Sequence, residues 1–329
     1  MATLKKFIVF IVALLGCFLR LGHCGATGPR TSPPVGCLVV RQSGTKASDY
    51  STISSAIVAL GSGTTAQCIF IYSGNYTEQV SIKGISGPLT IYGYTTDVSD
   101  FKHNTVTISH RLGSYDAGSL DASSTVWVRN DNVSFYNVNI ENTYTSGQAV
   151  AYTGIGLHQG FYGCGFKSYQ DTLYAKSGIQ YYSNCYIEGA VDYIFGDAAA
   201  WFGECTIASS GGGYITASSR TYDTDQAWYV IDHSLVAAAA GASVDGKVFL
   251  GRPWRPLARV IYQYSTLTGV VHPEGWAPMA EGATPIFMEY ENTGAGSDTF
   301  GSLFETPASA AMSKSQLWGG DAGWYDKAY

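Results

Sequence analysis

The sequence has little charge. Only 13% of its 329 residues are Asp, Glu, Lys or Arg, whereas 46% are hydrophobic. Few charges and many apolar side chains exclude a disordered chain and favour a large packed core. The formal net charge is −6, so we expect neither a nucleic acid nor an anionic membrane as a partner.

The N-terminus lacks an apolar run long enough to cross a bilayer. Lys5 and Lys6 precede FIVFIVALLGCFL, a run of 13 residues before Arg20, whereas a membrane span needs about 20. This pattern predicts a secretory signal peptide over 1–25 and an exported, extracellular protein with a single domain over 26–329. Removing three of the 19 basic residues leaves 16 against 25 acidic ones, which makes the remaining chain more acidic still.

Metal-binding spacings are also absent. The sequence contains no CxxC or HxxxH pair, and its six histidines include no close pair, so we expect no metal and no other cofactor. Cys164, Cys185 and Cys205 recur at nearly regular spacing. We interpret them as small hydrophobic core residues and not as catalytic thiols.

Other features agree with an extracellular location. Five cysteines follow the predicted signal, and this odd number leaves at least one thiol unpaired. Cys37 and Cys68 begin two similar segments, CLVV and CIFI, and could pair across neighbouring coils. The sequons at Asn75 and Asn132 are candidate glycosylation sites.

A strand-like segment repeats along the chain. Its central apolar residue returns every 20 to 26 residues, and no helical pattern separates the copies. One strand per short repeat is typical of a solenoid, and here it predicts an all-β parallel β-helix. The copies are NVNIEN (137–142), GCGFKS (163–168), NCYIEG (184–189) and ECTIAS (204–209), with looser continuations in HSLVAA and YSTLTG.

Two segments are predicted to cover this solenoid. DYSTISSAIVALG (49–61) has apolar residues at helical spacing, which predicts a short helix with Asp49 or Ser51 as its N-cap. Such a helix would cover the open N-terminal end of the solenoid. The aromatic tail LWGGDAGWYDKAY (317–329) is predicted to cover a side or the other end.

The repeat places two aspartates next to each other. Asp192 lies in an apolar run, and Asp171 precedes it by 21 residues, the spacing that also separates two of the core cysteines. Because neighbouring parallel strands lie about 4.8 Å apart, the two carboxylates should be side by side. Gln148 belongs to the preceding coil and Gln170 precedes Asp171, so the repeat predicts a column of Gln, Gln-Asp and Asp.

Two close carboxylates cannot both ionise easily, so one pKa rises while the other falls. Such a pair can divide the tasks of acid and nucleophile. Arg252, in LGRPWRP, is the best candidate for the base that decides which carboxylate stays charged. The alternative is a purely structural Asp–Arg pair with a second aspartate nearby by chance.

Five motifs resemble the pectin methylesterases, a family of carbohydrate esterases, and the form without a pro-region is similar to the fungal branch. The resemblance implies a right-handed parallel β-helix. It also implies a monomer that hydrolyses the methyl esters of galacturonate in pectin (methylated homogalacturonan) and releases methanol without a cofactor. The motifs are GNYTE (74–78), GQAVA (147–151), YQDTLYA (169–175), VDYIFG (191–196) and LGRPW (250–254).

The resemblance also implies roles for the matched residues. Asp192 resembles a nucleophile that forms an acyl-enzyme. Asp171 resembles the acid that protonates the departing methanol and then the base that activates water. Gln148 and Gln170 resemble the amide donors that hold the oxyanion, and Arg252 resembles the group that orients Asp192 and keeps it ionised.

The resemblance also implies that three aromatic residues of the motifs line the sugar subsites: Tyr174, Phe195 and Trp254. Tyr193 stands where Phe is usual in the family, and we expect its hydroxyl beside the nucleophile. The segment RPLARV after Trp254 also differs from many relatives, so the specificity of that subsite is left open.

Other activities fit the sequence less well. A pectin lyase would require a calcium-binding cluster of acids, and a polygalacturonase would require three acids with NTD, GHG and RIK signatures, which do not occur. A serine hydrolase is disfavoured because no GxSxG occurs. A wall-binding β-helix that has lost catalysis should lack Asp171, Asp192 or Arg252, yet all three are present.

Overall fold

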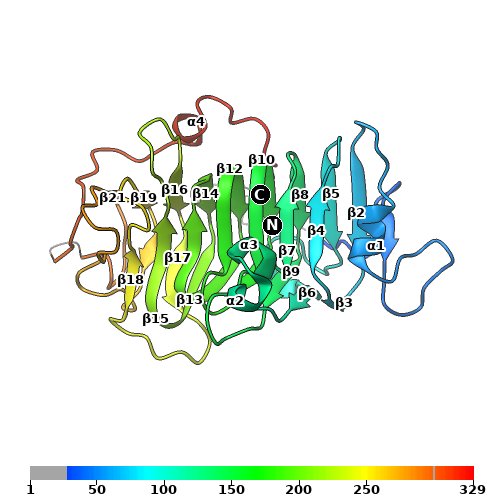
Figure 1. Ribbon diagram of the computed structural model, residues 1–329, viewed down its shortest axis with the longest axis horizontal. Helices are drawn as coiled ribbons and strands as arrows, with labels where there is room; N and C mark the ends of the chain where they lie inside the picture. The colour runs from blue at the N-terminus through cyan, green and yellow to red at the C-terminus, as the bar shows by residue number, and fades with distance from the viewer. Residues whose placement is uncertain (1–27, 299–300) are drawn as a thin grey trace, which may run out of the picture.

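The structure, a computed structural model, describes residues 28–298 and 301–329. The chain winds into a solenoid in which all pairings between the named strands are parallel (Figure 1). This confirms the all-β, right-handed parallel β-helix. The predicted signal peptide, residues 1–25, lies outside the described residues. No described helix is both long and apolar enough to cross a membrane.

Three sheets run along the solenoid, and the long strands β10, β12, β13 and β15 bend and contribute to two sheets each. Sheet 1 contains β4 (Val80–Lys83), β7 (Val126–Arg129), β10 (Tyr152–Tyr162), β12 (Leu173–Ser183), β13 (Tyr186–Gly196), β15 (Thr206–Ser218) and β18 (Val248–Gly251). Sheet 2 contains parts of β10 and β12 with β1 (Leu38–Val40), β2 (Gln67–Ile71), β5 (Leu89–Gly93), β8 (Val133–Tyr136), β14 (Ala199–Gly203), β16 (Trp228–Asp232), β19 (Arg259–Gln263) and β21 (Ile286–Tyr290). Sheet 3 contains parts of β13 and β15 with β3 (Gly74–Thr77), β6 (Val106–His110), β9 (Asn139–Asn142), β11 (Gly165–Lys167), β17 (Leu235–Ala238) and β20 (Thr266–Leu267).

The coils stack in the register that the repeat predicted. Ile140, Phe166, Ile187 and Ile207 pair one with the next across sheet 3, and Val236 continues the row. All five side chains are fully buried. Because side chains alternate between the two faces of a strand, a slip of one residue would turn this row out of the core.

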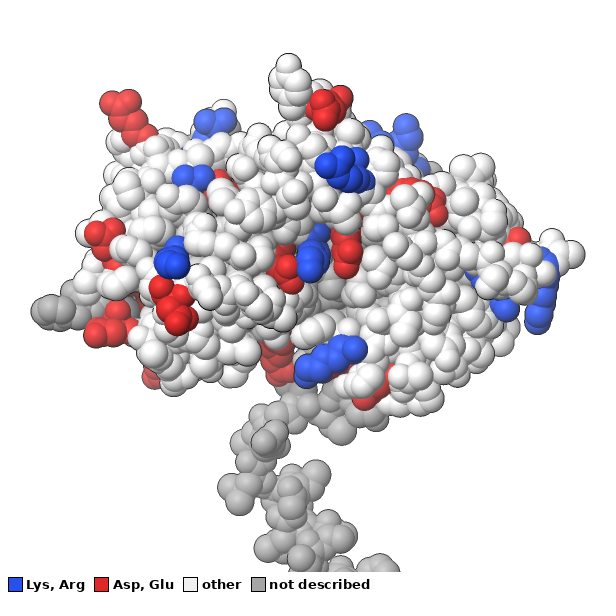
Figure 2. Space-filling model, turned by 90° about the horizontal axis from the view of Figure 1, so that it is seen from below, with Lys and Arg blue, Asp and Glu red and all other residues white. Residues whose placement is uncertain are grey.

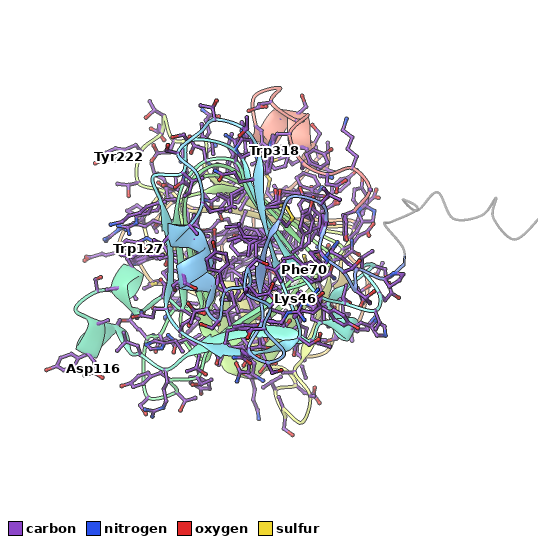
Figure 3. The ribbon with its side chains drawn as sticks, turned by 90° about the vertical axis from the view of Figure 1, so that its right-hand side faces the viewer. Lys46, Phe70, Asp116, Trp127, Tyr222 and Trp318 are labelled. Atoms are coloured by element: carbon purple, nitrogen blue, oxygen red, sulfur yellow. A yellow bond between two sulfur atoms is a disulfide. The ribbon has the colours of Figure 1, made fainter. Side chains whose placement is uncertain are left out.

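The interior is filled with side chains between the sheets, as the end-on view shows (Figure 3). The surface seen from below carries scattered charges of both signs, and neither sign gathers over a wide area (Figure 2). The mixed surface is in keeping with the low charge of the sequence.

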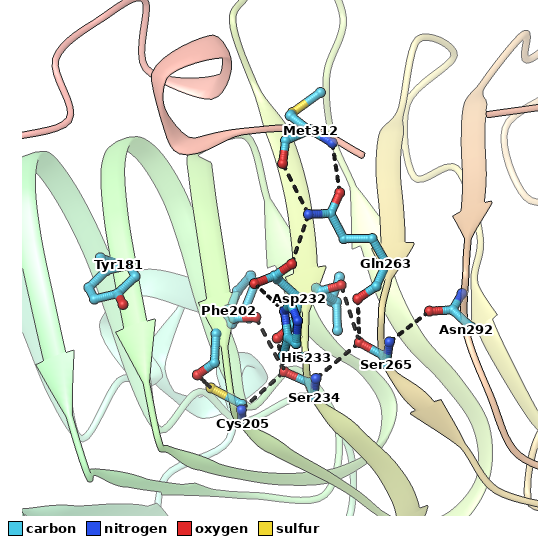
Figure 4. Close-up of polar contacts among 12 residues, drawn as sticks. Tyr181, Phe202, Cys205, Asp232, His233, Ser234, Gln263, Ser265, Asn292 and Met312 are labelled. Atoms are coloured by element: carbon cyan, nitrogen blue, oxygen red, sulfur yellow. Dashed lines mark hydrogen bonds and ion pairs between the residues drawn. The ribbon is translucent and has the colours of Figure 1, made fainter. Parts of the chain in front are cut away.

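The three free cysteines among the described residues are buried and belong to a column of side chains at one turn of each coil. The column continues beyond Cys205 with Ser234, Ser265 and Asn292 (Figure 4). From Cys205 onward, the backbone N–H of each member donates to the side chain of the next at 3.0 Å. These bonds satisfy N–H groups that would otherwise be buried without a partner. Residues just before the column adopt left-handed backbone with φ of about 50°: Asn184, Glu204, His233, Tyr264 and Glu291.

Helix α1 (Ile53–Val58) forms where a helix was predicted and packs at the N-terminal end of the solenoid (Figure 1). Its N-cap is Thr52, whose side chain accepts the N–H of Ser55 at 3.1 Å. The prediction of Asp49 or Ser51 was therefore wrong. Asp49 instead forms an ion pair with Arg41 at 2.8 Å.

Glu78, the glutamate of the first motif, has a structural contact. The Glu78 carboxylate accepts the N–H groups of Ile53 and Ser54 at 2.8 and 2.9 Å, at the positive end of α1. A disulfide joins Cys37 to Cys68, as the two similar segments suggested. Both contacts attach the helical cap to the first coils.

Several short helices were not predicted. Each spans only three or four residues, too few for a helical pattern to be visible in the sequence. They are η1 (Phe101–His103), α2 (Ser114–Ala117), α3 (Leu120–Ser123) and α4 (Lys314–Leu317).

The C-terminal tail covers the outer side of sheet 2, one of the two predicted positions. Trp318 is buried there and donates its indole N–H to the carbonyl of Ala199 at 3.0 Å. His158 holds the same tail through Asp321 at 2.7 Å. The tail therefore stays away from sheet 1, the face seen from the front in Figure 1.

Aromatic stacking in the core predicts a large effect of Phe161→Ala. The Phe161 ring is fully buried and stacks on Tyr182 at 4.7 Å. Its removal should leave a cavity and lower the free energy of unfolding by about 3–5 kcal/mol. Urea unfolding measures this, with Tyr115→Ala as control because Tyr115 is 93% exposed. An equal decrease in the free energy of unfolding in both variants would contradict tight packing of this aromatic stack.

Candidate active site

The two aspartates lie in successive coils of sheet 1, as the register predicted. Gln148 pairs with Gln170 along the backbone, and Gln170 pairs in turn with Val191, the residue before Asp192. The side chain of Gln148 donates from Nε2 to Oδ2 of Asp171 at 2.7 Å. Gln148, Asp171 and Asp192 therefore lie on one face, where they line a common cavity.

The backbone turns both carboxylates out of the regular strand pattern. Asp171 and Asp192 adopt left-handed conformations with φ of 67° and 50°, and the pairing of β13 with β15 shifts register across Asp192. Such conformations are unfavourable for residues other than glycine and are concentrated at functional sites. Both aspartates are nevertheless almost fully buried, at 3% and 7% exposure.

Arg252 holds Asp192 from two coils further along. It follows β18 and donates from Nε to Oδ1 at 2.8 Å and from Nη2 to Oδ2 at 2.7 Å, which uses both carboxylate oxygens. The guanidinium also lies 3.8 Å from the ring centre of Tyr214. Burial, the largest single cause, lowers the pKa of Arg252, but the hydrogen bond to Asp192 together with the charges of Asp192, Tyr214 and Asp171 outweighs it, so the pKa is raised. The predicted contact between Arg252 and Asp192 is confirmed.

Asp171 lacks such a partner, and its pKa is raised to about 7. Burial is the largest cause and the charge of Asp192 adds to it, whereas the hydrogen bond from Gln148 and the charge of Arg252 act in the opposite direction. The carboxylates are therefore unequal. Below pH 7 the site holds one ion pair and one neutral carboxylic acid.

A cavity of about 70 Å³ opens above the pair. Phe195 and Trp254 line it, and Tyr174, which pairs with Phe195 from the neighbouring strand, stacks on that ring at 4.2 Å. Sequence reasoning missed three lining residues, Leu120, Ala217 and Met279. Ala217 could have been found, because it pairs with Phe195 one coil later. Leu120 and Met279 come from a short helix and a loop without a repeat signal.

Tyr193 does not place its hydroxyl beside Asp192. Its side chain is fully buried and its hydroxyl bonds to that of Ser209 at 2.8 Å. The expectation was wrong because the backbone turns at Asp192, where the pairing of β13 with β15 is irregular, and the next two residues, Tyr193 and Ile194, both point into the core. Gln170, the second predicted amide donor, is half-buried beside Asp171.

No group of three or more His, Cys, Asp or Glu within 28–298 and 301–329 is arranged to hold a metal ion. The site consists instead of a carboxylate fixed by arginine, a carboxylic acid and amide donors. These groups can support nucleophilic and general acid–base chemistry at a carbonyl.

Comparison with known proteins gives one consistent result. The pectinesterase family matches residues 38–308. The chain is 56% identical over 309 residues to a probable pectinesterase A of Aspergillus niger, with 93% of each chain covered. It is 55% identical over 302 residues to pectinesterase A of Emericella nidulans, with 91% of each covered.

Solved structures agree with the sequence matches. Pectin methylesterase from Aspergillus niger, in deglycosylated form, superimposes with a TM-score of 0.88 at 55% identity, covering 92% of this chain and all of that one. Pectin methylesterase from carrot gives a TM-score of 0.76 at 28% identity, covering 85% and 90%.

The raised pKa of Asp171 predicts a pH-dependent stability that Asp171→Asn removes. The folded state holds this proton up to about pH 7, but the unfolded chain loses it near the ordinary value of 3.8. The stabilisation is therefore complete below pH 3.8 and is lost as the pH rises to 7. The variant should gain stability over the parent across this range, by at most about 4 kcal/mol above pH 7.

Urea unfolding at pH 5 and pH 8 measures the gain, and Asp116→Asn, on the exposed helix α2, is the control. A difference between Asp171→Asn and the parent that does not change with pH would contradict the raised pKa.

Proposed function

Because the chain belongs to the pectinesterase family, whose members are carboxylic ester hydrolases, we propose that it hydrolyses galacturonate methyl esters in pectin. One observation in particular supports this chemistry. Asp192 is held at both oxygens by Arg252 while Asp171, one coil away, has a pKa of about 7. One reactive anion and one neutral acid side by side are the two groups that ester exchange requires.

In the proposed first step, a carboxylate oxygen of Asp192 attacks the carbonyl carbon of the methyl ester. The carbonyl oxygen becomes an oxyanion, for which Gln148 and Gln170 supply amide N–H donors. Collapse of this intermediate breaks the bond to the methoxy oxygen, which takes the proton of Asp171 and leaves as methanol. The products of this step are an acyl-enzyme on Asp192 and an ionised Asp171.

In the second step, Asp171 takes a proton from water as the water attacks the acyl carbon. The bond between Asp192 and the sugar then breaks, which frees a galacturonate carboxylate and restores both aspartates. The pKa of Asp171 suits both tasks, because an acid–base group works best with a pKa near the working pH. Arg252 stabilises Asp192 whenever it is an anion, at the start and at the end.

The sugar next to the ester would contact Phe195 and Trp254, which line the cavity. Tyr174 lies beside Phe195 on the neighbouring strand, and in this proposal its stacked ring fixes Phe195 in place. Tyr174 belongs to the same outward row and would extend this subsite by one coil.

We also propose that the protein acts outside the cell as a monomer. The predicted signal peptide, the disulfide and the polymeric substrate support this location. The exposed sequon residues Asn75 and Asn132 could carry glycans. One solved structure of the Aspergillus niger enzyme bears an N-acetylglucosamine stub on an asparagine of its own.

The reaction type is tested with highly methylated pectin. We expect release of methanol without shortening of the polymer, and equal activity in EDTA because no described cluster could hold a metal. Gas chromatography measures the methanol and size-exclusion chromatography measures the polymer length. Shortened chains, or absorbance from unsaturated ends, would contradict an esterase.

Substitution of the two aspartates should lower the rate of methanol release to different extents. Asp192→Asn removes the nucleophile, so methanol release should fall by several orders of magnitude on every ester. Asp171→Asn removes acid–base help worth about 10²–10⁴-fold, and part of the loss should be recovered on esters whose leaving alcohol is already acidic. Arg252→Lys keeps the charge but cannot bind both oxygens, so activity should also fall.

Circular dichroism checks that the three variants are folded. Recovery of Asp192→Asn on activated esters, with Asp171→Asn inactive there, would reverse the assigned roles. Near-normal rates in both variants would make the carboxylate pair structural.

A further inference from the structure

A tryptophan lies in the same outward row of sheet 1 as the aromatic residues of the site. Trp127 on β7 pairs with Thr153 on β10, which pairs with Tyr174 on β12, which pairs with Phe195 on β13. Paired residues of parallel strands point to the same face. Trp127 is therefore three strand spacings, about 14 Å, from Phe195 along the solenoid.

The end-on view agrees with this position. Trp127 projects from the same side of the solenoid as Asp116 and Tyr222, whereas Trp318, in the C-terminal tail, lies on another side (Figure 3). Trp127 thus belongs to the face that carries the cavity, on the N-terminal side of the two aspartates.

Arg129 lies on this tryptophan. Its guanidinium carbon is 3.8 Å from the ring centre of Trp127, and its Nη2 donates to the hydroxyl of Ser81 at 3.0 Å. Stacking and one hydrogen bond fix the plane of the guanidinium while most of its five donors are left for another acceptor. Such pre-ordering lowers the entropy cost of binding a planar anion.

No acidic side chain among the described residues forms an ion pair with Arg129. Arg252 differs, since both oxygens of Asp192 occupy it. The Nε of Arg129 is also buried without a hydrogen-bond partner, although the residue as a whole is half-buried. The incoming carboxylate would therefore bind the Nη groups, which have donors to spare.

We propose that Arg129, oriented by Trp127, is a further substrate-binding residue that takes the free carboxylate of a galacturonate unit about three coils away from the reacting ester. A free carboxylate offers two charged oxygens to the guanidinium, whereas a methyl ester offers one neutral carbonyl. The subsite therefore distinguishes units that have lost their methyl group from units that keep it. This inference rests on the proposed function, which supplies the acidic polymer.

Partly de-esterified pectin then binds better than fully methylated pectin. Each hydrolysed ester creates the group that Arg129 recognises, so the product of one reaction improves binding for the next along the same chain. Salt should weaken the preference, because an exposed charge pair is screened at high ionic strength.

Binding is tested first without catalysis. A fully de-esterified oligogalacturonate long enough to span the row is titrated by calorimetry into the whole protein and into Arg129→Gln. The Kd should rise about five-fold in the variant at low salt, the effect of one exposed charge pair. Lys102→Gln is the control, because Lys102 also lies over an aromatic ring, Phe101, but on η1 and away from sheet 1.

Trp127→Ala tests the positioning role. It should raise the Kd as well, although it keeps the charge of Arg129, because the guanidinium is no longer held in plane. Melting temperatures check that each variant is folded.

A kinetic experiment is the second test of the Arg129 subsite. The ratio of kcat/KM on half de-esterified pectin to kcat/KM on fully methylated pectin should fall about five-fold in Arg129→Gln, mainly through KM, and should keep its parental value in Lys102→Gln. An unchanged Kd and an unchanged ratio, with methanol still released, would overturn the subsite and leave the proposed function intact. Absence of methanol release from the parent protein would overturn the proposed function, and calorimetry would still decide whether Arg129 binds the acidic chain.

Discussion

The register between successive coils is the constraint on which the rest of the structure depends. It keeps the row of Ile140, Phe166 and Ile187 in the core and the row of Trp127, Tyr174 and Phe195 on the outside. Because strand pairing has a period of two residues, register is strongly specified wherever one face is buried. The column of cysteine, serine and asparagine also fixes the register. The side chains of Ser234, Ser265 and Asn292 each accept a backbone N–H of the preceding coil. Asp171 and Asp192 become neighbours as a consequence of this stacking and need no contact of their own.

Two neighbouring carboxylates repel each other when both are charged, and Arg252 offsets this repulsion at only one of them. It binds both oxygens of Asp192 and leaves Asp171 with an amide partner only. Asp171 therefore keeps its proton up to about pH 7, while Asp192 forms an ion pair with Arg252. Replacing either aspartate by a group that does not titrate would remove this inequality. The proposed division of acid and nucleophile would thus follow from the reach of a single arginine, two coils beyond the pair.

Much of this arrangement follows from the sequence, because it depends on spacing between strands. The 21-residue interval predicted the aspartate pair, and the similar segments at Cys37 and Cys68 indicated the disulfide. Features set by single turns were not predictable in the same way. Leu120 reaches the cavity from a four-residue helix, and the cap of α1 shifted by one residue from Ser51 to Thr52.

The misplaced Tyr193 hydroxyl has another cause. Asp192 has a left-handed backbone in an irregular part of β13, and the next two residues, Tyr193 and Ile194, are both buried in the core. Neither the motif nor strict alternation describes this turn. Regular alternation holds on β7, where it identifies Trp127 as an outward residue in line with the site.

The charges along sheet 1 suit a polymer that changes charge as it reacts. At the centre, Asp192 is balanced by Arg252 and Asp171 is neutral below pH 7, so the reacting position has almost no net charge. On either side lies an arginine over a tryptophan, Arg129 on Trp127 and Arg255 on Trp254, at 3.8 and 5.5 Å. Neither arginine has a carboxylate partner among the described residues. A neutral centre between cationic flanks is complementary to a chain whose reacting unit is an uncharged ester and whose neighbours are already acids. The nearly neutral centre also avoids holding the newly formed carboxylate, because no free cation is left there to bind it.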